Sequence, residues 1–219
     1  MRQGSTRAVT SVSVEIPGPA GVIEAAIDSS VETPAAVAVI CHPHPQQQGT
    51  MHNKVVTTLA RAFTKLGAVS VRFNFRGVGS SAGRYAEGVG EREDALAVVA
   101  WCRARWRDCP LYLGGFSFGA AIALSIAARV APRGLITVAP AVDRLPADLV
   151  PPACPWVLVH GGADEVVPVE PVLAWCATLA APPGILLVDG VGHFFHGRLP
   201  AVSAAVHDAF GADFDVRGG

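Results

Sequence analysis

Residues Gly114–Ala121 read GGFSFGAA, and this stretch decides the fold. Ser117 stands between two phenylalanines, with glycines at positions 114, 115 and 119. Glycine loses more backbone entropy on folding than any other residue, so glycines this close together need a structural reason. The apolar run Leu111 to Phe116 before the serine is typical of a buried strand, and Ser117 to Val130 is almost wholly apolar. The stretch therefore predicts a strand, a sharp turn at Ser117 and a buried helix.

The same alternation of apolar run and amphipathic segment recurs along the chain, which predicts an α/β fold. Continuous apolar runs are typical of strands buried on both faces of a parallel sheet, with helices on both sides. Val9 to Ile27 alternates and carries PGPAG at its centre, which favours a hairpin that adds an antiparallel edge. The other strands are expected at Ala35–Cys41, Ala68–Phe75, Leu111–Phe116, Gly134–Pro140, Trp156–Gly161 and Gly184–Gly190, and the helices at Asn53–Leu66, Glu91–Arg105, Ser117–Val130, Glu170–Leu179 and Ala201–Phe210.

Length and composition favour one domain over residues 1–219, without a cap domain, because 51% of the residues are hydrophobic and can fill a sizeable core. The formal net charge of −1 argues against a nucleic-acid surface, which needs clustered Lys and Arg. Five scattered cysteines are not a disulfide framework. Residues 1–16 contain no apolar leader, and no apolar run is long enough to span a bilayer. We expect a cytoplasmic protein without nucleic-acid or membrane partners, either a monomer or a homodimer.

Gly115, Ser117 and Gly119 fit the pattern G-x-S-x-G, in which a strained strand-to-helix turn exposes a nucleophilic serine. An ordinary turn with a helix-capping serine would give the same five residues, so the pattern needs support. A serine needs a base to take its proton, and in this kind of fold the order along the chain is Ser, Asp or Glu, then His. Asp164 follows the predicted strand WVLVHG, and His193 follows the predicted strand GILLVDG. Order and loop position together predict a catalytic triad of Ser117, Asp164 and His193.

Each partner of the serine has rivals. Glu165 is adjacent to Asp164, and Asp143 follows another predicted strand, so either offers an alternative acid. His196 competes with His193 as base, but His193 lies closer to its strand end, and His196 is expected to be structural or to lie at the pocket rim. The alternative role of Asp164 is to cap the helix near Pro168.

A tetrahedral intermediate needs two N–H donors for its oxyanion. One is expected from Phe118, the residue after the nucleophile. The other is expected from the loop HPHPQQQGTMHNK, where Pro43 and Pro45 have no N–H, and we select His44 because two prolines fix it. His42, His44 and His52 with Cys41 also suggest a metal site, which is disfavoured because no carboxylate ligand is near. The loop GVGSSAG lacks the register of a nucleotide motif, and Arg76 in front of it is expected to anchor the loop on carbonyl groups.

These segments together resemble the α/β-hydrolase superfamily, and most nearly small, lidless serine hydrolases and carboxylesterases related to dienelactone hydrolases. The resemblance rests on CHPHPQQQGTMHNK, FNFRGVGSSAGRY, GGFSFGAA, HGGADEVVP and GVGHFF, which span the chain from Val37 to about Phe210. Two features depart from that pattern. Dienelactone hydrolases are usually cysteine enzymes, whereas Ser117 stands here, and the HPHP loop replaces the more familiar HG loop.

The resemblance and the residues imply a serine esterase that cleaves a small-molecule ester through an acyl-enzyme and needs no metal or organic cofactor. A thioesterase or a small-peptide hydrolase would use the same residues, and a binding protein that retains the fold is the non-enzymatic alternative. A carboxylate would stand in place of Ser117 in a haloalkane dehalogenase or an epoxide hydrolase. Residues Pro140 to Pro155, Phe194 and Phe195 are expected to line the pocket.

Overall fold

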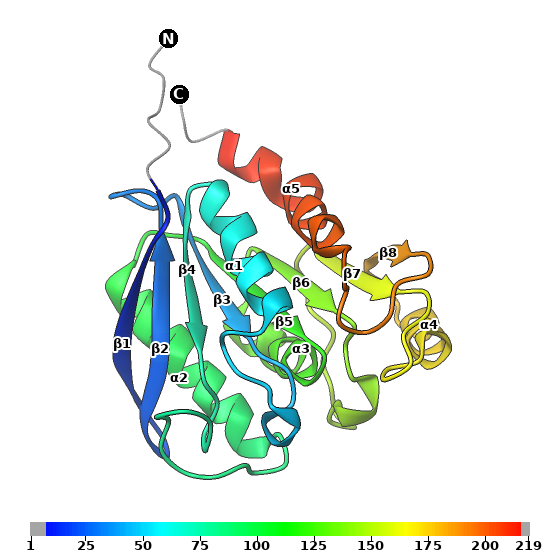
Figure 1. The fold of residues 1–219 in the computed structure, drawn as a ribbon, viewed down its shortest axis with the longest axis horizontal. Helices are drawn as coiled ribbons and strands as arrows, with labels where there is room; N and C mark the ends of the chain where they lie inside the picture. Colours follow the sequence, from blue (N-terminus) through cyan, green and yellow to red (C-terminus); the bar gives the residue numbers. More distant parts are fainter. Residues whose placement is uncertain (1–7, 216–219) are drawn as a thin grey trace.

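The computed structural model describes residues 8–215, and its eight strands form one sheet in the order β1-β2-β4-β3-β5-β6-β7-β8 (Figure 1). The hairpin of β1 (Thr10–Gly18) and β2 (Gly21–Ser29) is antiparallel, and β2 pairs antiparallel with β4 (Ala68–Phe73). The other pairs are parallel. They involve β3 (Ala36–Cys41), β5 (Leu111–Phe116), β6 (Gly134–Val138), β7 (Trp156–Gly161) and β8 (Gly184–Val188). The predicted parallel sheet with an antiparallel edge is confirmed.

Helices cover both faces of the sheet, as predicted. The core on one face includes residues of α1 (Lys54–Lys65) and α5 (Leu199–Asp215). The core on the other face includes residues of α2 (Val89–Arg105), α3 (Phe118–Val130) and α4 (Val169–Ala177). The segment between β6 and β7, residues 139–155, carries only the short 3-10 turn η2 (Val142–Arg144), so no cap domain is inserted there.

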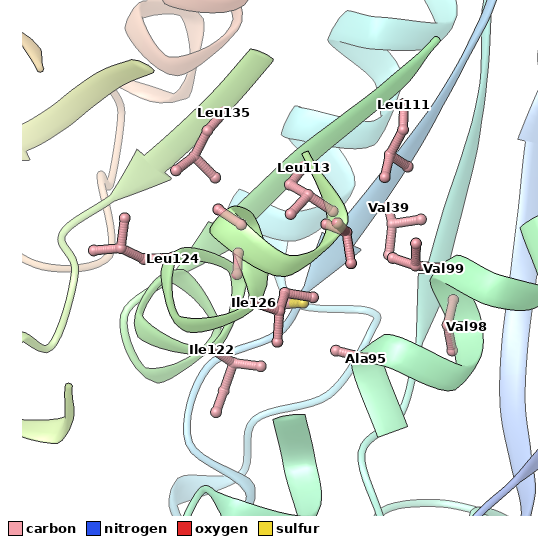
Figure 2. Packing of buried hydrophobic residues seen from close by; sticks show 14 of the residues in the cluster. Val39, Ala95, Val98, Val99, Leu111, Leu113, Ile122, Leu124, Ile126 and Leu135 are labelled. Carbon is pink, nitrogen blue, oxygen red and sulfur yellow. The ribbon is translucent and has the colours of Figure 1, made fainter. Parts of the chain in front are cut away.

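Helix α3 is buried because it is apolar on almost every side. Figure 2 shows Ile122, Leu124 and Ile126 of this helix in one buried cluster with Leu113 of β5 and with Ala95 and Val98 of α2. Full burial of one such aliphatic side chain stabilises the fold by about 1.5–3 kcal/mol. This packing holds the first turn of α3 firmly against the end of β5.

Strand β8 differs from the prediction that each apolar run is buried on both faces. Ile185, Leu186 and Leu187 are 42%, 39% and 43% exposed. The strand lies at the edge of the sheet, where β7 is its one neighbouring strand within residues 8–215. An apolar sequence was therefore not sufficient for burial, because the position of a strand in the sheet decides how much of it is covered.

The topology creates a crevice between β3 and β5, which are adjacent and parallel. After β3 the chain continues into α1 on one face, and after β5 it continues into α3 on the opposite face (Figure 1). In open α/β sheets such a reversal leaves a crevice at the carboxyl ends of the strands, where ligands bind. Ser117 and the HPHP loop both lie at this point.

Two sequence expectations concern leaders and membranes. The expectation of no leader concerns residues 1–16, and residues 1–7 lie outside the described residues. Within residues 8–215, none of the helices has the length and hydropathy needed to cross a bilayer.

Candidate active site

Ser117 has the backbone conformation of a strained turn, with φ 55° and ψ −119°. Positive φ is uncommon for a residue with a side chain, and such strain persists only where the surroundings fix it. The Ser117 N–H donates to the Val138 carbonyl at 2.9 Å. The Ser117 carbonyl accepts the N–H groups of Ala120 and Ala121 at 3.0 and 3.1 Å. The predicted sharp turn is thus present and is held from both sides.

The glycines of the turn allow close approach of the backbone. A Cβ at Gly115 would overlap the Gly119 carbonyl oxygen. A Cβ at Gly119 would overlap the carbonyl oxygens of Cys41 and His42, which belong to β3 and the loop after it. Larger residues would push α3 away from β5 and from the HPHP loop, so the glycines bring the N-terminus of α3 next to that loop.

His193 and Asp164, from the loops after β8 and β7, lie within hydrogen-bond distance. His193 Nδ1 is 2.8 Å from Asp164 Oδ2. The other carboxylate oxygen accepts the N–H groups of Val166 and Val167 at 2.9 and 2.8 Å. Burial acts to raise the pKa of Asp164, but the hydrogen bonds from His193, Val167 and Val166 together outweigh it and hold that pKa below its usual value. Asp164 is therefore ionised near neutral pH and can accept a hydrogen bond from a protonated His193 Nδ1.

The rival acids and the rival base are placed elsewhere. Asp143 is exposed and pairs with Arg144 at 3.3 Å. Glu165 is exposed, and its carboxylate lies beside Gly192. The His196 ring is also exposed and packs on Phe194, with ring centroids 5.9 Å apart.

Ser117 and His193 line the same cavity, of about 280 Å³. The residues around it are Pro43, His44, Gln47, Gln48, Asn53, Ser117, Val166, His193 and Phe194. Phe194 lines it as expected, but the expectation for Phe195 was wrong, because this side chain is fully buried in the core. Residues Pro140 to Pro155 are also absent from this lining, and several of them border hollows beside α3 instead.

The HPHP loop is fixed by the buried ring of His42. The Phe75 N–H donates to His42 Nε2 at 3.0 Å, so Nδ1 carries the proton and donates to the Pro43 carbonyl at 2.6 Å. That carbonyl and the His44 N–H belong to one trans peptide group and point in opposite directions. His42 therefore orients the His44 N–H, and burial lowers the pKa of His42 to about 4, which keeps the ring neutral.

Two backbone N–H groups, from a residue that shares the cavity with Ser117 and from the residue after it, have no acceptor among the described residues. One is that of His44, and the other is that of Phe118, the first residue of α3. The His44 ring is held separately, with Nδ1 accepting the Gln46 N–H at 3.2 Å and Nε2 lying 3.1 Å from the Tyr85 hydroxyl. Both N–H groups are free to donate to a ligand.

The glycine-rich loop after β4 binds a side chain of the protein itself. The Ser80 N–H donates to Glu24 at 2.8 Å, and a Cβ at Gly79 would overlap the same carboxylate. Arg76 anchors the loop through carboxylates rather than the expected carbonyls, with hydrogen bonds of 2.8 and 3.0 Å to Asp94. Among residues 8–215, no group of three or more His, Cys, Asp or Glu side chains could hold a metal ion.

Several residues of the site were not selected from the sequence. Gln47, Gln48, Asn53 and Val166 border the cavity, and their places in the loops after β3 and β7 were the available signal. His160 lies in β7, four residues before Asp164, and its Nε2 is 3.5 Å from Asp164 Oδ2. The signal for it was a buried histidine four positions ahead of the predicted acid.

The chain is similar in sequence and in fold to known proteins. The family model described as serine aminopeptidase S33 matches residues 32–156. An uncharacterized protein of Rickettsia prowazekii is 31% identical over 202 residues, which cover 87% of this chain and 85% of that protein.

Two solved structures are more similar still. A serine hydrolase without a lid from Xanthomonas campestris is 40% identical, with a TM-score of 0.86 over 91% of this chain and 93% of that one. An alpha-beta serine hydrolase homologue from Coxiella burnetii is 44% identical, with a TM-score of 0.84 over 89% and 95% of the two chains. The chain therefore belongs to the serine aminopeptidase S33 family of the α/β-hydrolase superfamily and is an α/β serine hydrolase of the lidless type.

Proposed function

We propose that this hydrolase cleaves carboxylic esters through a triad of Ser117, His193 and Asp164. One arrangement carries the proposal. Ser117, on its strained turn, and His193 line one cavity, while His193 Nδ1 lies 2.8 Å from Asp164 Oδ2. The shared cavity and the His193–Asp164 contact support the order of nucleophile, base and orienting acid that such catalysis requires.

Acylation begins when Ser117 Oγ attacks the ester carbonyl carbon. Because the ionised Asp164 can only accept a hydrogen bond, His193 carries its proton on Nδ1 and leaves Nε2 free as the base. His193 Nε2 takes the serine proton and then delivers it to the leaving alcohol. Asp164 stabilises the imidazolium that forms in between.

The N–H groups of Phe118 and His44 would bind the oxyanion of the tetrahedral intermediate. Both are without an acceptor among the described residues, and the N-terminus of α3 adds a favourable dipole there. Loss of one such donor typically costs about a hundredfold or more in rate. Water then attacks the acyl-enzyme with His193 as base, so the cycle needs no metal or organic cofactor.

The cavity favours small, uncharged acyl groups. Its volume of about 280 Å³ is slightly below the roughly 300–1,000 Å³ of typical ligand pockets. The nine lining residues are three amides, two histidines, one proline, one valine, one phenylalanine and Ser117 itself. Small amides are the second candidate, because the matching family model is described as a serine aminopeptidase.

The first experiment is labelling with a fluorophosphonate probe, followed by mass spectrometry of the labelled peptide. We expect the label on Ser117 in the wild-type protein, none in Ser117→Ala, and full labelling in Ser125→Ala, a serine of the same helix. We also expect slow labelling in His193→Ala and normal labelling in His196→Ala. A folded wild-type protein that takes no label would contradict the proposal and favour a binding function.

Substrate class is then decided by rates on matched compounds. A series of p-nitrophenyl esters from acetyl to decanoyl, a short thioester and an aminoacyl anilide share the carbonyl chemistry and differ in leaving group or chain length. We expect the largest kcat/KM for the short esters. A higher value for the anilide would replace the ester assignment by peptidase activity.

A further inference from the structure

His160 in β7 has an unusual environment for a buried histidine. Its side chain is fully buried, and its Nε2 lies 2.9 Å from the Val167 carbonyl oxygen. Among residues 8–215, its Nδ1 is the one buried side-chain nitrogen or oxygen without a hydrogen-bond partner. An unpaired buried polar atom is costly, so a residue that keeps one needs a reason other than packing.

The contact with Val167 determines the protonation of the ring. A carbonyl oxygen only accepts, so Nε2 carries the proton and donates, and Nδ1 is a bare lone pair. Burial, the largest influence, lowers the pKa of His160 and outweighs the hydrogen bond to Val167 and the charges of Asp164 and Glu170, which act to raise it, while the neighbouring His193 lowers it further. The ring is therefore neutral with one N–H, directed at the loop after β7.

That N–H completes the turn that holds Asp164. The Val167 N–H donates to Asp164 Oδ1 at 2.8 Å, and the Val167 carbonyl accepts from His160. Asp164 Oδ2, which lies 2.8 Å from His193 Nδ1, is also 3.5 Å from His160 Nε2. Both polar groups of Val167 are thus fixed, and one carboxylate oxygen lies between two imidazoles.

We propose that His160 is a positioning residue for the Asp164–His193 pair. It fixes Val167, and through it the carboxylate, so that Asp164 Oδ2 is presented to His193 Nδ1. Its neutrality is part of the role, because a cationic His160 would compete with His193 for the charge of Asp164. The inference rests on the proposed triad and adds a residue that touches neither substrate nor Ser117 in that mechanism.

Two substitutions separate the N–H from the volume of the ring. His160→Leu removes the donor and keeps an apolar side chain of similar size, whereas His160→Gln keeps an amide N–H at similar reach. We expect His160→Leu to lower kcat by about 10- to 100-fold with KM within about twofold, as expected for a displacement on the order of 1 Å. His160→Gln should recover most of the loss.

The pH profile of kcat/KM distinguishes positioning from mere loss of stability. With Asp164 less well placed, the His193 imidazolium is stabilised less, so the acid limb should move to lower pH in His160→Leu and return in His160→Gln. Leu158→Ala is the matched control, because Leu158 is a fully buried residue two positions earlier in β7. It should lower stability without moving the acid limb.

The outcomes separate this inference from the proposed function. If wild-type Ser117 is labelled and a folded His160→Leu keeps the wild-type kcat and acid limb, the positioning role is wrong while the triad stands. If His160→Leu does not fold, His160→Asn replaces it, because its amide is too short to reach Val167. A wild-type acid limb in His160→Asn would likewise overturn the inference. Failure of the wild-type label would instead overturn the triad.

Discussion

At the scale of single residues, the conformation of Ser117 depends on the absence of neighbouring side chains. A positive φ at a non-glycine residue is a source of strain on the order of 1–3 kcal/mol. Its N–H donates to Val138, and its carbonyl accepts from Ala120 and Ala121, so the backbone is held on both sides. These contacts are possible only because Gly115 and Gly119 let α3 approach β5 and the HPHP loop.

Gly119→Ala should therefore damage both stability and activity. The added methyl group overlaps the carbonyl oxygens of Cys41 and His42, which are backbone atoms and cannot rotate away. We expect a loss of about 2 kcal/mol or more in the free energy of unfolding, measured with urea, and at least about a hundredfold loss in Ser117 labelling rate. Gly184→Ala is the control, because its Cβ would make only ordinary contacts of 3.8 Å or more. Equal behaviour of the two variants would contradict the close-approach argument.

Asp164→Asn tests the acid without removing volume. An amide in place of the carboxylate favours the wrong tautomer of His193 and no longer stabilises its cation. We expect kcat on short esters to fall by about a thousandfold or more, with folding intact by circular dichroism. Asp143→Asn, at the exposed rival position, should leave kcat within about twofold of wild type. Similar losses in both variants would argue for a different acid.

At the scale of elements, strand position decides what an apolar residue contributes. Leu113 is fully buried in β5, a strand with neighbours on both sides, whereas Leu186 in the edge strand β8 is 39% exposed. Both belong to short apolar runs that look alike in the sequence. The free energy of unfolding should distinguish them.

We expect Leu113→Ala to lower the free energy of unfolding by about 2–5 kcal/mol, because it leaves a cavity in a packed core. Leu186→Ala should lower it by about 1 kcal/mol or less, since much of that side chain already contacts solvent. Urea unfolding followed by tryptophan fluorescence measures both. A larger loss for Leu186→Ala would mean that the edge is covered in solution.

The loop after β3 is held by its neighbours as well as by hydrogen bonds of its own. Arg72 of β4 donates to the Met51 carbonyl at 2.7 Å and pairs with Asp28. Asn74 accepts the Met51 N–H at 2.8 Å, and His42 accepts the Phe75 N–H. The place of the His44 N–H therefore depends on β4 and the residues just after it.

At the scale of the whole molecule, buried neutral histidines make stability depend on pH. Burial lowers the pKa of His42 to about 4 and also lowers that of His160. A group whose pKa is lower in the folded chain binds fewer protons there than in the unfolded chain, so stability falls as pH falls between the two values. For His42 this window runs from about 6.5 down to about 4. The lowered pKa of Asp164 acts in the same direction at more acidic pH, below its usual value.

We expect the free energy of unfolding to decrease from pH 7 to pH 4, with His42 contributing on the order of 3 kcal/mol. His42→Gln should be less stable at pH 7 but should lose less stability on acidification. His196→Gln, at an exposed position, should keep the wild-type slope. Urea unfolding at several pH values measures the slopes, and an unchanged slope in His42→Gln would contradict the assignment.

The sequence by itself determined the features that depend on short-range patterns. Apolar periodicity located the strands and helices to within a few residues, because burial and backbone geometry repeat locally. The G-x-S-x-G spacing predicted the turn at Ser117 for the same reason, and loop order selected Asp164 and His193 for the proposed triad. Periodicity and spacing lie within short stretches, and the order of Ser117, Asp164 and His193 follows directly from their positions along the chain.

Only the tertiary structure decided which of these residues meet and which are covered. The order of strands placed Asp164 beside His193, left Asp143 on the surface, exposed β8 at the edge and buried Phe195 in the core. It also brought His160 close to Asp164 and placed the Glu24 carboxylate in the glycine-rich loop. No local sequence pattern predicts either contact. Such contacts depend on the packing of segments that are far apart in the chain. The packing energies that select one arrangement over another cannot be derived from the pattern of a single sequence.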